Sequence, residues 1–530
     1  KKAANDAPVT SQHHVDDLLK EIQQLRSSNR LLTKELIEVR NKSSAGPLVG
    51  RNKNQQSEER REEHVSENAN ERTTRRKATK TTPEKKMNIV LLYADDWSYK
   101  TLGAAGNSFV KTPYLDDLAS KGVHFTHNCV TTSICWISRS SLYTGQYVSR
   151  HKCPRVEDVE YYNRWNETLY GALASNGYYN AFYGKWHHNF DNFPEWSFGE
   201  REFYFGSHFL GNGQHVTEKN EADALKFLKK RPNMSQPFIL TVSFFATHAE
   251  DGSTGQYYPQ KRSMELYQNE EVPIAPNADV GNSTLNWDKL PPFFVDKNEA
   301  RKRWNWRFDT HKKYQEMMKN YYRMATEVDK SCGAIIEELK RQRLMDNTLI
   351  IFTTDNGNYH AEHGLADKWY PHEESIRVPL IVYDPRLPSS KAGMKNDEFT
   401  LNIDLAPTML KAAGIEPPEA MQGKDIADLY LKDNTPWRKE FFYEWPDPFD
   451  QKDWIPAAQA LVRKDYKYMY WPQHDYDQLF HLKEDPMEMN DLRQNSSVSS
   501  LLAEMKSRFG ILREAAAGNL TDSNAIISPV

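Results

Sequence analysis

Three mostly apolar runs, at 88–93, 238–244 and 348–354, are each followed by polar residues or end in them. Runs of this kind are typical of strands that are buried on both faces of a sheet. Helical patterns lie between them, and the clearest, at 321–343, places apolar side chains at helical spacing. Strands that alternate with helices predict an α/β fold in which helices cover both faces of the sheet. Ligands of such folds gather outside the carboxyl ends of the strands.

The pattern changes beyond about Pro436. Short strands rich in Tyr and Trp are predicted at 460–463 and 467–471, and a helix is predicted at 499–515. These elements indicate a smaller antiparallel sheet with a helix. We therefore assign residues 87–435 to the main α/β domain and residues 436–530 to a C-terminal α+β subdomain.

The first 86 residues have a different pattern. Over about 15–40, spacings of four and three residues form a heptad seam of Leu18, Ile22, Leu25, Asn29, Leu32, Leu36 and Val39. A polar residue within such a seam fixes the register of a coiled coil. We predict self-association through these heptads, and the alternative is a single amphipathic helix lying on the folded domain. Residues 51–86 contain 11 basic and 7 acidic residues, which predicts a charged linker and makes 1–86 a stem.

Composition supports a boundary near residue 87. All 13 Trp, 27 Tyr and 23 Phe residues lie in 87–530, so only this part buries enough apolar surface to offset its chain entropy. A net charge of −4 gives the chain no basic field and argues against nucleic acid as a partner. No apolar run is long enough to span a bilayer.

Sequence motifs also indicate the cellular compartment in which the protein is expected. Asn-x-Ser/Thr acceptors occur at Asn41, Asn166, Asn233, Asn282, Asn495 and Asn519. This density favours the secretory lumen, with a lysosomal or extracellular destination, and chance is the alternative because the motif is short. The chain begins with Lys, so we expect that a signal peptide or anchor was removed, and a membrane tether through that segment stays open. The four cysteines show no Cys-x-x-Cys pair for zinc.

Polar side chains follow two of the predicted strands. Asp95 and Asp96 come after the first strand, and Asp355 and Asn356 come after the third. Carboxylate and amide oxygens are the ligands that Ca²⁺ and Mg²⁺ prefer. The alternative for each pair alone is a turn or a helix cap.

A Cys and an Arg open a predicted helix that ends in Thr144 and Gly145. Cys135 precedes Arg139 by four residues, which places the thiol at or near the helix N-terminus, one turn from a cation. This environment predicts a lowered thiol pKa and attraction for anions. The alternative is a buried structural Cys beside a surface Arg.

From Met87 to about Leu492 the chain resembles the type I sulfatases of the alkaline phosphatase superfamily. The matching segments are 88–103, 112–122, 135–145, 184–187, 246–248, 346–357, 404–408 and 485–488. The resemblance implies a large mixed β-sheet sandwiched by helices, with a smaller C-terminal antiparallel sheet plus helix. It also implies sulfatase activity, the hydrolysis of sulfuric esters.

The resemblance further implies a cofactor and a modified residue. One Ca²⁺ is expected to be held by Asp95, Asp96, Asp355 and Asn356. A formylglycine-generating enzyme is the expected maturation partner, and it would oxidise Cys135 to formylglycine. The hydrate of that aldehyde would supply the nucleophilic oxygen and later expel the sulfate by C–O cleavage.

The other implied roles surround the sulfur atom. Arg139 would orient the hydrate and His187 would assist it. Lys185 and Lys368 would bind sulfate oxygens, and His248 would protonate the leaving alcohol. Cations suit this reaction because a sulfate ester is ringed by negative oxygens.

One position departs from the family pattern. Two residues after the modified Cys, most members have Pro, and this chain has Ile137. Either the maturation enzyme accepts the relaxed motif, or Cys135 stays a thiol and the protein is a catalytically impaired glycan-binding relative. A phosphoryl-transfer enzyme of the same superfamily is a further alternative, against which the Cys and the single oxygen-rich metal site argue.

Two further groups of residues allow two interpretations each. His360, His363 and His372, with Glu373 and Arg377, either line the substrate pocket near Lys368 or belong to loops and the core. Trp304 and Trp306, in a basic run, either stack on a sugar ring beside arginines that meet further sulfates or form a surface cluster. The leading hypothesis is a calcium-dependent formylglycine sulfatase acting on a sulfated carbohydrate, with uronate, glucosamine and galactan sulfates all open.

Overall fold

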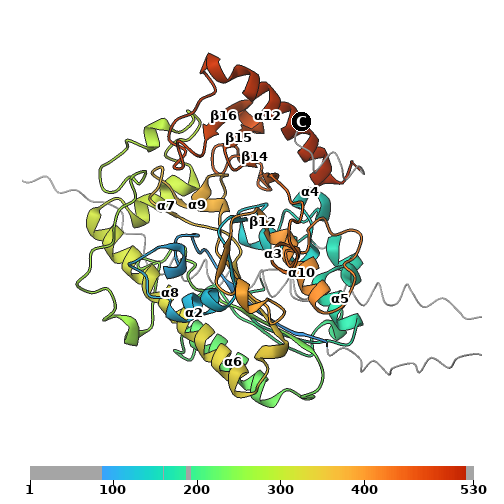
Figure 1. Cartoon of the computed structure of the whole chain (residues 1–530). Helices are drawn as coiled ribbons and strands as arrows, with labels where there is room; N and C mark the ends of the chain where they lie inside the picture. Colours follow the sequence, from blue (N-terminus) through green and yellow to red (C-terminus); the bar gives the residue numbers. More distant parts are fainter. Residues whose placement is uncertain (1–85, 159, 187–192, 521–530) are drawn as a thin grey trace, which may run out of the picture. The chain divides into compact units, whose positions relative to one another are not determined.

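The computed structural model describes residues 86–158, 160–186 and 193–520 (Figure 1). The predicted coiled coil, most of the linker and His187 lie outside the described residues. By compactness the chain divides into Lys1–Lys80 and Thr81–Val530, and the second unit contains all of the described residues. The finer division at 86/87 and 435/436 stays a prediction.

The centre of this unit is an eight-stranded sheet in which only β10 runs antiparallel to its neighbours. Its strands, in spatial order, are β11 (Met394–Asn396), β2 (Val123–Phe125), β10 (Leu380–Tyr383), β7 (Thr348–Thr354), β1 (Asn88–Ala94), β6 (Phe238–Ser243), β4 (Tyr179–Gly184) and β5 (Glu200–Phe203). The predicted runs are thus the three central strands, β6, β1 and β7. All three are buried throughout, which explains why they lack polar alternation.

Helices cover both faces of the sheet, on opposite sides in Figure 1. Successive side chains of a strand point to opposite faces, so Val90 and Leu92 of β1 face one layer, and Ile89 and Leu91 face the other. The first layer contains α2 (Pro113–Lys121), α6 (Val216–Lys230) and α8 (His311–Arg341). The second contains α3 (Cys135–Thr144), α5 (Leu169–Ser175) and α10 (Leu405–Ala412).

A second sheet lies toward the C-terminus. It is an antiparallel meander of β13 (Glu440–Trp445), β14 (Ala458–Arg463), β15 (Tyr466–Trp471) and β16 (Tyr476–His481). Helix α12 (Ser499–Ala517) packs Met505, Phe509 and Leu512 against Phe442 and Leu461 of this sheet. Side chains on the other face of the sheet pack in one apolar cluster with residues in and next to α3.

Short elements connect these layers. Within the described residues they include α4 (Val148–His151), α7 (Glu299–Arg307), α9 (Glu373–Ile376) and α11 (Asp428–Leu431), and two small sheets that pair β3 (Asn128–Cys129) with β12 (Thr400–Leu401) and β8 (Tyr359–His360) with β9 (Ala366–Asp367). The predicted fold class is therefore confirmed, with a mixed main sheet between helices and a smaller antiparallel sheet with a helix. None of the described helices is long and apolar enough to cross a membrane.

Candidate active site

The ends of β1 and β7 bring the predicted metal ligands together. The two strands pair in parallel with Ala94 opposite Thr354, so the next residues of both strands leave the sheet side by side. The backbone N–H of Asp96 donates to Asp355 Oδ1 at 3.3 Å, and Asn356 Nδ2 donates to Asp96 Oδ1 at 2.5 Å. Asp96 adopts a left-handed backbone with φ of 56°, which Asp tolerates better than most residues. Its side chain is thereby turned toward β7.

Oxygen atoms without a hydrogen-bond partner mark this cluster as a place for a cation. Among the described residues, Asp95 Oδ1 and Asn356 Oδ1 are buried and accept no hydrogen bond. Ligand atoms of Asp95, Asp96 and His248 all lie within 4.8 Å of one another. Burial raises the pKa of Asp95, and the nearby Asp355 carboxylate raises it further, although the charges of Lys185 and Arg139 partly offset both effects. A hard divalent ion fits this donor set.

Two lysines approach the same carboxylates. Lys185 Nζ donates to Asp95 Oδ2, and Lys368 Nζ lies 2.5 Å and 2.8 Å from the two carboxylate oxygens of Asp96. Both lysines are buried. Burial lowers the pKa of Lys368, but the neighbouring acidic groups outweigh it and hold the ammonium charged. The site therefore holds fixed cations beside the predicted metal ligands.

Lys185 follows β4 directly, and the glycine before it makes this placement possible. Gly184 has φ of 109°, and a Cβ there would lie 1.9 Å from the backbone oxygen of Ser243. The backbone N–H of Lys185 donates to the same oxygen at 2.9 Å. A side chain at position 184 would push β4 from β6 and move the lysine.

Arg139 contacts the ends of three strands of the main sheet. Its Nε donates to Asp355 Oδ2 at 2.9 Å, and its Nη1 donates to the backbone oxygen of Lys185 at 2.8 Å and to Ser243 Oγ at 2.6 Å. The guanidinium is fully buried and lies 4.6 Å from the ring centroid of Tyr93. Arg139 thus joins α3 to the ends of β4, β6 and β7.

Cys135 is the first residue of α3, as predicted, but its thiol pKa is not lowered. Burial raises this pKa, and the charges of Lys185 and Lys368 only partly offset it. The prediction was wrong because it counted the helix end and the cation and could not see that the side chain is 2% exposed. Ile137 is fully buried in an apolar cluster that includes Cys129, Val148 and Ile403.

His248 lies in the loop after β6 and faces the same carboxylates. Its Nδ1 is 2.6 Å from the backbone oxygen of Ala249, which leaves Nε2 directed toward Asp96 Oδ2 at 3.7 Å. Burial lowers its pKa, and the charges of Lys368 and Lys185 lower it further.

Two neighbours that the sequence did not single out hold the His248 loop in place. Thr247 Oγ1 donates to the backbone oxygens of Asp95 and Asp96 at 3.2 Å. His208 Nε2 is 2.8 Å from the backbone oxygen of His248. The sequence offered a signal only for Thr247, which stands next to His248.

His363 and His372 lie away from the contacts of Lys368. His363 and His372 stack with ring centroids 4.5 Å apart, and Tyr359 Oη is 2.6 Å from His372 Nδ1. They line a small cavity with residues of the C-terminal sheet, among them Gln478 and Phe480. Of the two interpretations, the structure supports core histidines for this pair.

Other residues assigned to a pocket are also engaged elsewhere. Arg377 Nε donates to the backbone oxygen of Thr126 at 2.7 Å, and with Glu373 it lines a cleft of about 180 Å³ that contains none of the predicted site residues. Trp304 is buried, and its Nε1 donates to the backbone oxygen of Asp279 at 2.7 Å. Stacking of Trp304 on a sugar is therefore excluded.

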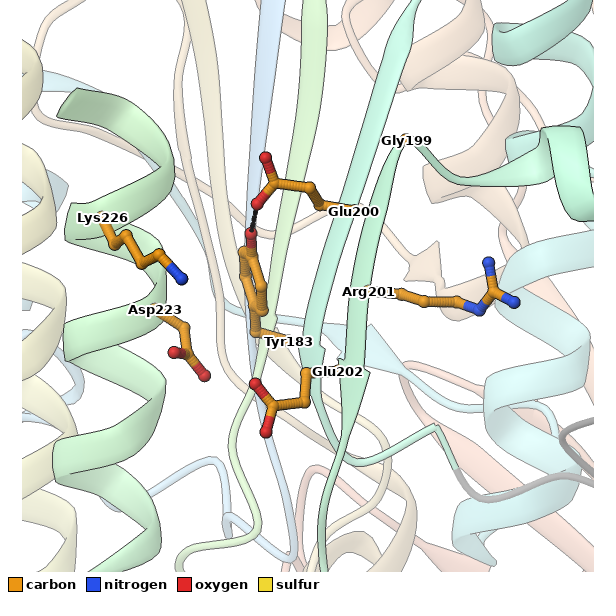
Figure 2. Close-up of a pocket in the computed structure, with 7 residues that line it drawn as sticks. All are labelled: Tyr183, Gly199, Glu200, Arg201, Glu202, Asp223 and Lys226. Atoms are coloured by element: carbon orange, nitrogen blue, oxygen red, sulfur yellow. Dashed lines mark hydrogen bonds between the residues drawn. The ribbon is translucent and has the colours of Figure 1, made fainter. Parts of the chain in front are cut away.

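The edge of the sheet contains a cavity of about 510 Å³ between β5 and α6 (Figure 2). Its acidic side chains have local partners: Tyr183 Oη donates to Glu200 Oε2 at 2.6 Å, and Lys219 Nζ lies within 3.1 Å of Glu202 and Asp223. None of the predicted site residues lines it. Cavity size therefore does not locate the chemistry of this molecule.

Comparisons with known proteins agree with the geometry. The sulfatase family model matches residues 87–415, and a model described as N-sulphoglucosamine sulphohydrolase, C-terminal, matches residues 361–515. An N-acetylglucosamine-6-O-sulfatase of Bacteroides thetaiotaomicron is 25% identical over 498 residues, which cover 80% of this chain and 87% of the relative.

Solved structures share the fold. One, determined in complex with its substrate D-glucosamine-2-N,6-O-disulfate, superposes with a TM-score of 0.67 at 21% identity and covers 83% of this chain and 99% of its own. A phosphonate monoester hydrolase from Silicibacter pomeroyi gives a TM-score of 0.68 at 19% identity, with 82% and 95% covered. Since the family model spans more than half of the chain, the protein belongs to the sulfatase family of sulfuric ester hydrolases.

Proposed function

We propose that this sulfatase hydrolyses sulfate esters on a sulfated carbohydrate, using a formylglycine derived from Cys135 and one Ca²⁺. The observation that supports it most directly is the gathering of buried cations and unpartnered oxygens around the ends of β1 and β7, beside the helix that Cys135 opens. The relative named N-acetylglucosamine-6-O-sulfatase and the neighbour solved with a sulfated glucosamine support a sugar as substrate.

Different residues of the chain would take different roles in the reaction. Asp95, Asp96, Asp355 and Asn356 would hold the Ca²⁺, which would supply positive charge to the reacting sulfate oxygens. The formylglycine hydrate would supply one oxygen to attack sulfur and a second hydroxyl to release the sulfate. Lys185 and Lys368 would neutralise the remaining sulfate oxygens from fixed positions, which spares the reorganisation that water would need.

His248 would handle the proton of the leaving group. Its Nδ1 is held by the backbone oxygen of Ala249, so Nε2 is the ring nitrogen free to face the substrate. To donate a proton from Nε2 to the departing alcohol oxygen, it would have to be an imidazolium. The negative charge of a bound sulfate ester would therefore have to offset the burial and the lysine charges that lower the pKa of His248. Arg139 would keep the carboxylate of Asp355 in place throughout.

Mass spectrometry of the Cys135 peptide tests the maturation step. Protein made together with a formylglycine-generating enzyme should contain an aldehyde at this position, and Cys332, buried in α8, serves as the unmodified control in the same digest. The matured enzyme should release sulfate from defined sulfated saccharides, and Cys135→Ala should release none. An unmodified thiol, or faster turnover of phosphate or phosphonate esters than of sulfates, would contradict the proposal.

We also propose that the protein acts in the secretory lumen, in lysosomes or outside the cell. Of the six glycosylation motifs, five fall in the described residues, and the asparagines of all five are exposed: Asn166, Asn233, Asn282, Asn495 and Asn519. Glycosylation needs such exposure. Protein produced in a eukaryotic secretory host should lose mass on treatment with an N-glycosidase, and an unchanged mass would contradict this assignment.

A further inference from the structure

Helix α7 presents two arginines, one turn apart, to the same two aspartates. Arg303 Nη1 lies 2.8 Å from Asp251 Oδ2 and 3.0 Å from Asp367 Oδ2. Arg307 Nη2 lies 3.0 Å from Asp251 Oδ1, and its Nη1 lies 2.8 Å from Asp367 Oδ2. Each arginine therefore bridges both carboxylates, and the four charges balance.

The two aspartates belong to the two segments that contain His248 and Lys368. Asp251 lies three residues after His248, and Asp367 comes directly before Lys368. Arg303 also lies 5.2 Å from the ring centroid of Trp369, the residue on the other side of Lys368. Asp367 itself is fully buried. The α7 arginines thus contact the chain close to His248 and on both sides of Lys368.

Arg307 is not placed to bind a substrate sulfate, and Arg303 also binds protein side chains. Arg307 is fully buried, and its remaining donor, Nε, binds Gln256 Oε1 at 2.6 Å. Arg303 Nε donates to Glu299 Oε1 at 2.8 Å. All three guanidinium nitrogens of Arg307 bind side chains of the protein, which contradicts the interpretation that this arginine meets a further sulfate.

We propose that Arg303 and Arg307 are positioning residues that fix the spacing between His248 and Lys368 through Asp251 and Asp367. The proposal rests on the proposed function, in which His248 serves the leaving alcohol and Lys368 binds the sulfate. A bridge of this kind needs the planar fork of arginine, because one ammonium cannot meet two carboxylates in the same fixed geometry. Displacing a catalytic group by about 1 Å costs about 10²-fold in rate.

The test uses two substrates of the full-length matured enzyme, an aryl sulfate with an acidic phenol as leaving group and a sugar sulfate with a weakly acidic alcohol. Arg307→Lys should lower kcat on the sugar sulfate about 10²-fold and on the aryl sulfate about 10-fold, because only the poor leaving group depends strongly on a well-placed proton donor. It should also weaken competitive inhibition by inorganic sulfate about 10-fold, which reports on Lys368.

A network that only stabilised the fold would lower both rates by one factor and leave the inhibition constant unchanged, and that result overturns the proposal. Arg323→Lys is the matched control, since Arg323 is a buried arginine of α8 that binds the backbone oxygens of Met264 and Leu266. It should leave the ratio of the two rates unchanged. If Arg307→Lys does not fold, the charge-balanced pair Arg303→Gln with Asp251→Asn replaces it, with the same expected change in ratio.

A measurement of sulfate binding distinguishes failure of this proposal from failure of the proposed function. Calorimetric titration of inorganic sulfate into Cys135→Ala protein needs no turnover. Adding Arg307→Lys to this background should weaken sulfate binding about 10-fold even if the wild-type protein hydrolyses neither ester. Unchanged binding overturns the positioning role, and an active wild type would then leave the sulfatase function standing.

Discussion

Arg139 and Asp355 lie 216 residues apart in the chain, and the guanidinium holds one carboxylate oxygen from two nitrogens, Nε at 2.9 Å and Nη2 at 2.8 Å from Oδ2. Both side chains are fully buried. The pair joins the helix that begins at Cys135 to the strand end that supplies half of the proposed metal ligands. The helix of the proposed nucleophile and the proposed cation site are therefore joined directly by one ion pair.

Arg139→Lys should retain the charge but lose this forked contact. Since lysine cannot reach Asp355, Lys185 and Ser243 together, we expect kcat to fall about 10²-fold with a smaller loss of stability. Arg139→Ala should cost about 3–5 kcal/mol of unfolding free energy, because it leaves the buried carboxylate of Asp355 without its cationic partner. Steady-state kinetics and urea unfolding measure the two effects, and unchanged kcat in Arg139→Lys would contradict the assignment.

Asp355→Asn should weaken Ca²⁺ binding while it preserves the shape of the site. Removing one negative ligand charge should lower the affinity at least about 10-fold. Calorimetry measures this directly. In the wild type, Ca²⁺ at 100 times its Kd should add about 2.7 kcal/mol of stability, a gain that should fall to about 1.4 kcal/mol or less in the variant at the same concentration. Asp329→Asn, an equally buried change on α8, should keep the gain, and an equal gain in Asp355→Asn would argue against the site.

Asp329 should make stability depend on pH in a defined direction. Burial raises its pKa to about 7, although it accepts hydrogen bonds from the backbone of Tyr114 and Leu115 at the start of α2. Since this folded pKa exceeds the unfolded value, near 3.8, the group favours folding below about pH 4, and that contribution is lost as the pH rises to about 7.

Asp329→Asn removes this titration, so its stability relative to the wild type should improve as the pH rises. Between pH 5 and pH 7 the relative gain should be about 2.3 kcal/mol. Urea unfolding at the two pH values measures it. A difference between variant and wild type that is constant over this range would refute the raised pKa, whatever the sign of the difference.

Gly184→Ala should reduce activity more than its backbone strain explains. The added Cβ would collide with the backbone oxygen of Ser243 and displace Lys185. Gly177→Ala is the matched control, because Gly177 also has a positive φ, of 83°, but no atom lies within 4 Å of the place that its Cβ would take. Both should lose about 1–2 kcal/mol of stability from strain, and only Gly184→Ala should raise KM for the sulfate ester. Equal kinetics in both variants would count against the placement.

Ile137→Pro should increase the extent of maturation at Cys135 and lower the stability of the fold. Proline is the residue that most sulfatase motifs have here, and it is tolerated in the first turn of a helix. It also removes a fully buried side chain from an apolar cluster, at a cost of about 1–3 kcal/mol. We expect a larger formylglycine fraction by mass spectrometry and a lower melting temperature. A smaller fraction than in the wild type would show that Ile137 does not limit maturation.

Much of the fold was predictable because its signals are local. The apolar run at 348–354 coincides with β7, and the strand predicted at 467–471 extends by one residue to Tyr466. The heptads lie outside the described residues, so that prediction stays untested. Helix α8 begins ten residues before its predicted start, because Thr310 caps it by accepting from the backbone N–H of Lys313.

The properties of the site were harder to predict where they depend on burial or on partners that are distant in the chain. Asp95 and Asp355 were found because parallel strands end at one edge, which topology alone dictates. The raised pKa of Cys135 depends on a degree of burial that no local pattern encodes. The partners of Arg303 lie 52 and 64 residues away in the chain, so a basic run that reads as a sulfate-binding surface is instead internally neutralised.

Because Cys135 is buried in the first turn of α3, its proposed oxidation would have to precede the packing of this turn. An enzyme that reads residues 135–139 as an extended segment has no access once this turn is packed against the sheet. The strand β7, to which Arg139 is tied through Asp355, is synthesised roughly 200 residues after Cys135, which takes about 10–40 s at ribosomal speed. The proposed modification would therefore compete with folding during translation, and the late synthesis of β7 would give a modifying enzyme time to act before this ion pair forms.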